Sequence, residues 1–218
     1  MEGVRIACLY SYGCPDLKRI GAEKLIFDFI KDTDKSKLSL VKGILEKLEP
    51  FLFYRLIGKM NDIDNPFNLH VVKAYWLGNN LLRTIKKEDV SISSVYSLKL
   101  SDFVGGKAHH NFSVIWSTKR ASNIPIEKFD ECLIKPGKII ELKEKNILVE
   151  TKRLFSERKK IYFKDTTQEI SREVLRGLIS FDDWVSIHFG TAREKISRNC
   201  AQNLIEITKE AISLFQKG

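Results

Sequence analysis

The sequence contains 218 residues, of which 43% are hydrophobic and 30% are charged. This length and composition predict one large folded domain or two small ones, and they exclude a mainly disordered or fibrous chain. Lys and Arg outnumber Asp and Glu and give a formal net charge of +9, which favours an acidic protein, a nucleic acid or an anionic lipid as partner without choosing among them.

Three absences in the sequence predict where the protein resides. No apolar run reaches the roughly 20 residues of a membrane-spanning helix, so no membrane partner is expected. The N-terminal residues lack the basic start, apolar run and cleavage site of a secretory signal. The cysteines Cys8, Cys14, Cys132 and Cys200 form no CxxC pair, so we expect reduced thiols in a cytoplasmic protein.

Apolar residues recur close to a 3.6-residue period through much of the first hundred residues. The expected helices cover residues 14–32, 38–60 and 69–85. Pro15 stands at a natural first helical position, whereas Gly43 and Pro50 are expected to split the second segment into two helices. Gly78 predicts a kink or an end in the third.

The hydrophobic pattern changes in the second half of the chain. Alternating residues near 108–118 predict a short β segment, and a domain boundary is expected near residues 120–130. Two strands around a polar turn at residues 143–146 follow, then a third strand in RKKIYF and a fourth in DDWVSIHFG. An amphipathic helix over residues 197–215 ends the chain. The fold class expected is α+β, with a mainly helical domain over residues 1–125.

Two segments of the second half resemble a known family when they are taken together. They are residues 132–141 (CLIKPGKIIE) and residues 183–192 (DWVSIHFGTA). Their order, the Cys-to-Pro spacing and the helix after the His motif are similar to those of the HypC/HupF family, the small chaperones of nickel-iron hydrogenase maturation. The resemblance covers residues 130–218 and is poor between residues 154 and 181. In that family the cysteine is the N-terminal residue after Met removal, whereas Cys132 is internal.

The resemblance implies a fold and a function. It implies a small, partly open, OB-like β-barrel over residues 130–218, with a C-terminal helix. Cys132 and His188 would be ligands of an iron that carries cyanide and carbon monoxide, delivered to a hydrogenase large subunit or exchanged with other maturation proteins. Such an accessory protein would not be an enzyme in the turnover sense. The segments NPFNLHVVKAYWLGNNLL and HHNFSVIW also resemble an uncharacterised family associated with hydrogenase gene neighbourhoods.

The same residues allow structural interpretations. A cysteine that serves only as a small buried residue at the start of a strand would give the same pattern as Cys132. His188 alternates with Trp184 and Ser186, on the strand face opposite the apolar residues Val185 and Ile187. This pattern is equally typical of a solvated strand histidine.

A second interpretation is a Cys/His enzyme built on Cys14. Its sulfur precedes Pro15 and an expected helix, whose N-terminal N–H groups would stabilise a thiolate. His109 or His110 would then be the base or a further metal ligand. If these two histidines lie in a strand they point to opposite faces, so only one of them joins a given site.

A third interpretation is an OB-like protein that binds nucleic acid along a basic edge of the barrel. Aromatic residues Phe155 and Tyr162 are interleaved with the basic run, as is typical of sites that stack bases and hold phosphates. The basic residues are Lys152, Arg153, Arg158, Lys159 and Lys160. A solvated barrel edge protected from pairing by its charges has the same pattern. No Walker loop, GxGxxG, HExxH or GxSxG motif is present.

Overall fold

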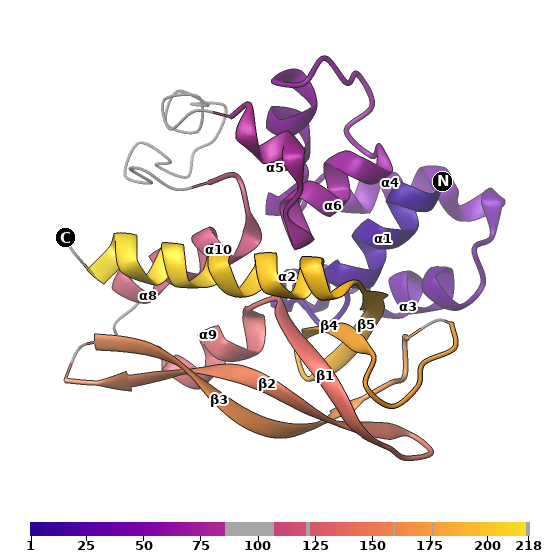
Figure 1. The fold of residues 1–218 in the computed structure, drawn as a ribbon. Coiled ribbons are helices and arrows are strands. Elements are labelled where there is room, and N and C mark those ends of the chain that lie inside the picture. Colours follow the sequence, from indigo (N-terminus) through magenta and orange to yellow (C-terminus); the bar gives the residue numbers. More distant parts are fainter. Residues whose placement is uncertain (86–106, 121–122, 159, 176, 217–218) are drawn as a thin grey trace. The chain divides into compact units, whose positions relative to one another are not determined.

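The computed structural model describes residues 1–85, 107–120, 123–158, 160–175 and 177–216 (Figure 1). The chain divides into two units, Met1–His110 and Asn111–Gly218. The division falls after the first residue of a helix, so His110 ends the first unit and begins a helix that continues into the second. Among the described residues, no helix is both long enough and apolar enough to cross a membrane.

Helices form the described part of the first unit. They are α1 (Glu2–Ser11), α2 (Pro15–Arg19), α3 (Glu23–Lys31), α4 (Leu38–Leu45), α5 (Glu49–Lys59) and α6 (Leu69–Leu77), with 3-10 turns η1 (Lys35–Lys37) and η2 (Asn80–Arg83). Pro15 and Pro50 stand in the first turns of α2 and α5, where a backbone N–H has no helical partner to lose. Gly78, with a φ of 75°, ends α6 as its sequence position predicts.

The first unit is built around α1, which the sequence periodicity did not predict. Helix α1 contacts α3, α4 and α6, and the ring of Tyr10 stacks on Trp76 of α6 at a centroid distance of 5.4 Å. A Cβ atom at Gly3 would lie 1.9 Å from the carbonyl oxygen of Phe67. Only glycine allows this close approach, because real Cβ atoms need more than 3 Å.

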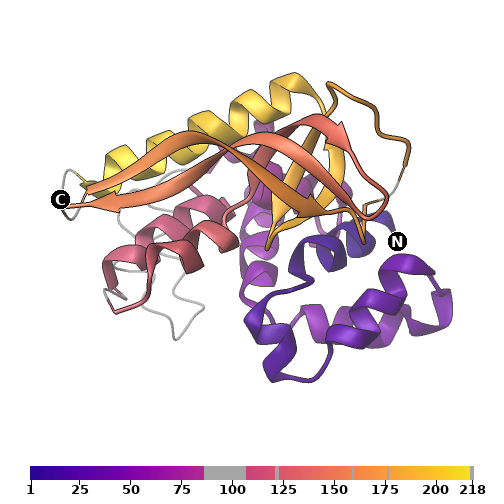
Figure 2. The ribbon, with the colours of Figure 1, turned by 90° about the horizontal axis from the view of Figure 1, so that it is seen from below.

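The second unit combines helices with a closed five-stranded barrel (Figure 2). Its elements are α8 (His110–Arg120), α9 (Ile126–Cys132), β1 (Lys135–Leu142), β2 (Asn146–Glu157), β3 (Lys160–Ser171), β4 (Trp184–His188), β5 (Thr191–Ile196) and α10 (Arg198–Gln216). The strand order is β1-β2-β3-β5-β4, and β1 pairs with β4 to close the barrel. Helix α10 packs against β1, β3 and β4.

Small β-branched and aliphatic side chains fill the barrel. The buried core consists of Ile139, Ile147, Val149, Ile170, Val185, Ile187 and Ala192. Gly137 makes this packing possible, because a Cβ there would lie 2.7 Å from Ile187 Cδ1 and 3.1 Å from Val149. The Pro-Gly step therefore brings β1 against its neighbours where any larger residue would collide.

The α+β class, the helical N-terminal part, the barrel and the C-terminal helix are confirmed. The polar turn at residues 143–146 joins β1 and β2 as expected. The short β segment expected near 108–118 is wrong, because residues 110–120 form helix α8. The chain divides into its two units between residues 110 and 111, and the domain boundary near residues 120–130 stays a prediction. Strand β5 and helix α9 were not predicted either.

Candidate metal centre

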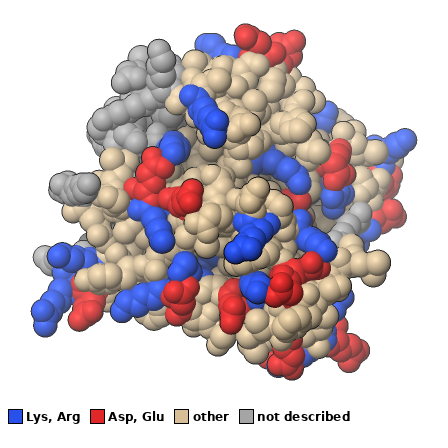
Figure 3. All heavy atoms as spheres, in the orientation of Figure 1, with Lys and Arg blue, Asp and Glu red and all other residues tan. Residues whose placement is uncertain are grey.

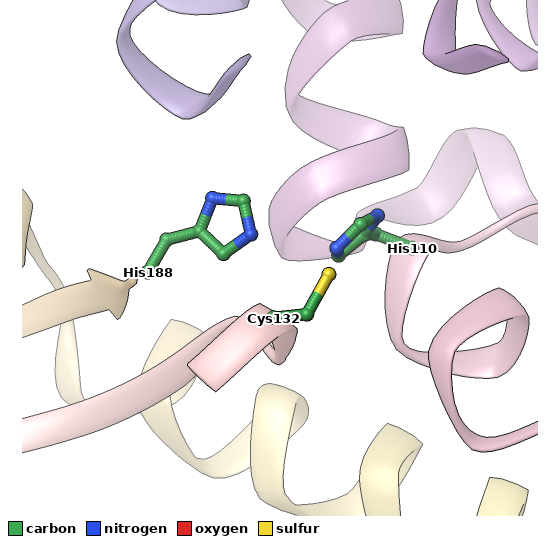
Figure 4. A group of neighbouring side chains, drawn as sticks. All are labelled: His110, Cys132 and His188. Atoms are coloured by element: carbon green, nitrogen blue, oxygen red, sulfur yellow. The ribbon is translucent and has the colours of Figure 1, made fainter. Parts of the chain in front are cut away.

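Three side chains that can bind a metal ion come together in the structure: His110, Cys132 and His188 (Figure 4). One ligand atom of each residue lies within 4.8 Å of the ligand atoms of the other two. His110 is the first residue of α8, Cys132 the last of α9 and His188 the last of β4. The three ligands thus stand at element ends, more than twenty residues apart from one another in the sequence.

The start of α8 is held in place by the residue next to His110. The side chain of Asn111 is fully buried. Its Oδ1 accepts a hydrogen bond of 2.9 Å from the N–H of Ile134, and its Nδ2 donates one of 2.8 Å to the Ile134 carbonyl. Nδ2 also donates to the hydroxyl of Thr208 in α10. These bonds satisfy main-chain groups two residues beyond Cys132, so Asn111 fixes His110 relative to the cysteine.

The end of α9, where Cys132 lies, is held by a buried ionic contact. Asp130 is 1% exposed and its Oδ2 lies 2.8 Å from Lys135 Nζ in β1 and 2.8 Å from Arg153 Nε in β2. Its Oδ1 accepts a hydrogen bond from the N–H of Leu154. Burial lowers the pKa of Lys135, and the Asp130 carboxylate opposes that shift. One carboxylate therefore joins α9 to two strands just before the cysteine.

His188 is held by contacts on both sides of its position. The N–H of Phe189 donates a 2.8 Å hydrogen bond to the carbonyl of Glu131, so the residue after the histidine bonds to the residue before the cysteine. Arg193, itself buried, donates to the His188 carbonyl at 2.8 Å. Phe189 and Gly190 have positive φ angles of 47° and 66°, which turn the chain directly after His188 into β5.

The expectation of a solvated His188 is wrong. Val185 and Ile187 lie in the barrel core as the alternation predicts, but Ser186 and His188 on the opposite face of β4 are also buried. Helix α10 packs against β4. A strand covered on both faces buries its polar residues along with its apolar ones. A buried polar group needs a specific partner in place of water, so the burial of the His188 imidazole favours a specific role.

The donor set fits a transition metal. One thiolate and two imidazoles are ligands of zinc and of iron, nickel or copper in their lower oxidation states. Bonds of about 2.3 Å to sulfur and 2.1 Å to nitrogen place neighbouring ligand atoms of a tetrahedral ion roughly 3.5 Å apart. Side chains already within 4.8 Å reach that spacing with small rotations. Three protein ligands leave a fourth position for an exchangeable ligand.

The predicted second site at Cys14, with His109 or His110, is not favoured by its electrostatics. Cys14 precedes α2, which has five residues. Burial raises the pKa of the Cys14 thiol, the opposite of what an activated nucleophile requires. His109 is fully buried, and desolvation lowers its pKa to about 3. His110 lies beside Cys132 and His188, and the argument from opposite strand faces fails because His110 begins a helix.

Some basic residues of the predicted nucleic-acid-binding edge form ion pairs within the protein. Lys152 pairs with Asp165 and Arg153 with buried Asp130. Arg158 and Lys160, at the end of the β2–β3 hairpin, are exposed, and Lys159 lies outside the described residues. Two of the five cations are therefore engaged in ion pairs within the protein.

The sequence did not identify His110 as a partner of Cys132 and His188, because it assigned the histidine to a strand and to another site. Asn111 and Asp130, which hold the ligands, were also missed. A signal for Asp130 exists in the sequence. Lys135 stands in the apolar run CLIKPG, five residues after Asp130, where a charge needs a partner.

Comparisons with known proteins give a family and no activity. The model of a family of unknown function, DUF6390, matches residues 49–217. No curated protein and no solved structure matches the chain.

Proposed function

The chain belongs to DUF6390, a family of unknown function, and we propose that it is an accessory protein that carries a transition-metal ion through His110, Cys132 and His188. The observation that supports the proposal is the convergence of these three ligand atoms within 4.8 Å. They come from three elements whose ends are joined by the buried hydrogen bonds of Asn111 and by the hydrogen bond from the Phe189 N–H to the Glu131 carbonyl. A thiolate with two imidazoles binds iron, nickel or zinc.

The cargo that we propose is ferrous iron bearing cyanide and carbon monoxide, passed to the large subunit of a nickel-iron hydrogenase. This part of the proposal rests on the resemblance of residues 132–141 and 183–192 to the HypC/HupF family. In that family the cysteine has a free amine, whereas the nitrogen of Cys132 is in a peptide bond. His110 would supply a third metal-binding atom in a chain whose cysteine, Cys132, has no free amine.

The site suits transfer better than permanent retention. His188 is buried and Cys132 is partly exposed, so the ion would be exchanged on the side of the cysteine. Three protein ligands leave a coordination position for the small ligands of the cargo or for a ligand of the acceptor. The excess of basic residues, +9 overall, would speed encounter with an acidic acceptor.

The proposal is tested on protein purified without oxygen from cells whose hydrogenase maturation machinery is shown to be active. Metal content and infrared spectra are measured for the native chain and for H110A, C132A and H188A. Cys200→Ala is the matched control, because Cys200 is also partly exposed but lies outside the cluster. We expect iron with cyanide and carbonyl bands in the native chain and in the control, and neither in the three variants.

Two other results separate the parts of the proposal. If cobalt(II) titrated into the native chain gives a thiolate charge-transfer band that only the three variants lose, while no cyanide or carbonyl band is ever found, the metal site stands and the hydrogenase assignment is refuted. If the native chain binds neither iron nor cobalt, both parts are refuted, and the three residues are structural.

A further inference from the structure

The outer part of the β2–β3 hairpin exposes two aromatic rings side by side. The strands pair in register along their whole length, from Asn146↔Ser171 to Glu157↔Lys160, and the hairpin reaches beyond the barrel (Figure 2). Phe155 and Tyr162 are directly opposite each other in this register, and 42% and 37% of their surfaces are exposed. Opposed residues of an antiparallel pair have their Cβ atoms about 5 Å apart, so the two rings form one apolar surface.

Positive charge surrounds these rings. The ammonium group of Lys164 lies 5.7 Å from the centroid of the Phe155 ring and 5.3 Å from that of Tyr162. Arg158 and Lys160 are exposed at the end of the hairpin. The described residues 155–158 and 160–164 include three cations, Arg158, Lys160 and Lys164, and one acid, Glu157. Figure 3 shows Lys and Arg side chains gathered at the lower left, over this end of the hairpin.

We propose that this face of the hairpin binds single-stranded nucleic acid. The rings of Phe155 and Tyr162 would stack on bases, and Arg158, Lys160 and Lys164 would contact phosphates. Exposed aromatic rings set among cations are the arrangement by which single strands are held without sequence preference. The proposal concerns a surface other than the metal centre and does not depend on the metal.

The charge pattern favours a nucleic acid over a protein partner. The centre of a protein interface is depleted in lysine, whereas here the lysine lies directly over the ring pair. When a base stacks on a ring, the ammonium group can move to the adjacent phosphate and keep a charged partner.

The experiment measures binding of a fluorescently labelled 15-nucleotide oligo-dT, and of oligo-rU of the same length, to the full chain by anisotropy between 50 and 200 mM NaCl. We expect F155A/Y162A to weaken binding by about tenfold or more, as loss of one or two stacked bases does. The salt dependence should stay the same in this variant, because no cation is removed. K164A and K160A should each reduce the slope of log K against log salt by about 0.7.

The controls change similar residues elsewhere. Phe181→Ala removes an aromatic ring that is 66% exposed on the β3–β4 connection, and Lys47→Ala removes an exposed cation of the first unit. Both should bind like the native chain. Absence of binding at 50 mM NaCl, or equal affinity of F155A/Y162A and the native chain, would overturn the proposal. So would vesicles of phosphatidylglycerol that bind with the same dependence on both rings, since the face would then recognise an anionic lipid surface.

Discussion

The carboxylate of Asp130 offers the sharpest test of how the second unit is held together. It lies between Lys135 and Arg153 and accepts the N–H of Leu154, while only 2% of its side chain is exposed. Asp130→Asn keeps the size of the side chain and removes its charge. Breaking a buried ion pair by removing one partner costs about 3–5 kcal/mol, because the other charge stays buried without compensation.

We expect this loss in urea unfolding followed by circular dichroism, where about 3–5 kcal/mol corresponds to a midpoint lowered by roughly 1–2 M. Amide exchange of the peptide that contains Leu154 should accelerate in the same variant, since this N–H loses its charged acceptor. Asp165→Asn is the matched control. Asp165 also pairs with a lysine of the hairpin, but 87% of its side chain is exposed, so the midpoint should hardly move.

The stability of the Asp130→Asn variant should depend on pH with a definite sign. Burial lowers the pKa of Lys135 and Asp130 opposes the shift, so removing the carboxylate lowers that pKa further. The unfolded chain then binds more protons than the folded chain at pH values between this lowered pKa and the ordinary pKa of lysine, and stability rises with pH in that window. The penalty of D130N should therefore shrink as the pH rises toward the ordinary pKa of lysine. D130N/K135M should recover much of the loss, because the uncompensated ammonium group is gone. A loss below about 1 kcal/mol in D130N, or no recovery in the double variant, would refute the reasoning.

Three further predictions concern other parts of the chain. Gly137→Ala should lower the free energy of unfolding by about 1–3 kcal/mol, because the new Cβ meets Ile187 at 2.7 Å. Gly43→Ala should raise the free energy of unfolding by about 0.5–1 kcal/mol, because Gly43 lies in α4 with open space around it. Urea titration compares the two variants, and the reverse order of stability would contradict the packing argument. Iodoacetamide should alkylate Cys14 more slowly at pH 7.5 than a free thiol peptide, because burial raises its pKa, and a faster rate measured by mass spectrometry would restore the enzyme interpretation. Chelation with EDTA should leave a folded chain with a cooperative thermal transition, and a chain that unfolds on chelation would indicate a structural metal instead.

The elements that the sequence predicted are those with a regular pattern and clear ends. The strands from β1 to β4 alternate around turns, and α10 has a continuous apolar stripe over five turns. Helix α1 was missed because it is buried on nearly every side, which removes the contrast between two faces on which periodicity depends. Residues 110–120 were misread because Phe112, Val114 and Trp116 alternate locally. Long-range contacts of Asn111 with Ile134 and Thr208 favour the helix instead.

The candidate metal centre could be predicted only in part. Cys132 and His188 stand in two segments whose resemblance to one family points to them. His110 could not be identified as a third ligand, because its side chain would point in different directions in a strand and in a helix. Its separations from Cys132 and His188, 22 and 78 positions, also follow no regular spacing. What places His110 near Cys132 is the pair of buried hydrogen bonds between the side chain of Asn111 and the main chain of Ile134. Such contacts depend on the finished fold.

The same contacts bear on whether a bound metal would be cargo or a structural part. In small zinc domains the ion supplies the folding free energy, so the protein unfolds without it. Here the barrel has its own core of seven buried aliphatic residues, and the element ends that carry the ligands are joined by Asp130, Asn111 and the Phe189 N–H. None of these bonds involves the three ligand atoms. Ligands held in this way would stay in position without an ion, as the proposed carrier function requires in order to release one metal ion and bind another.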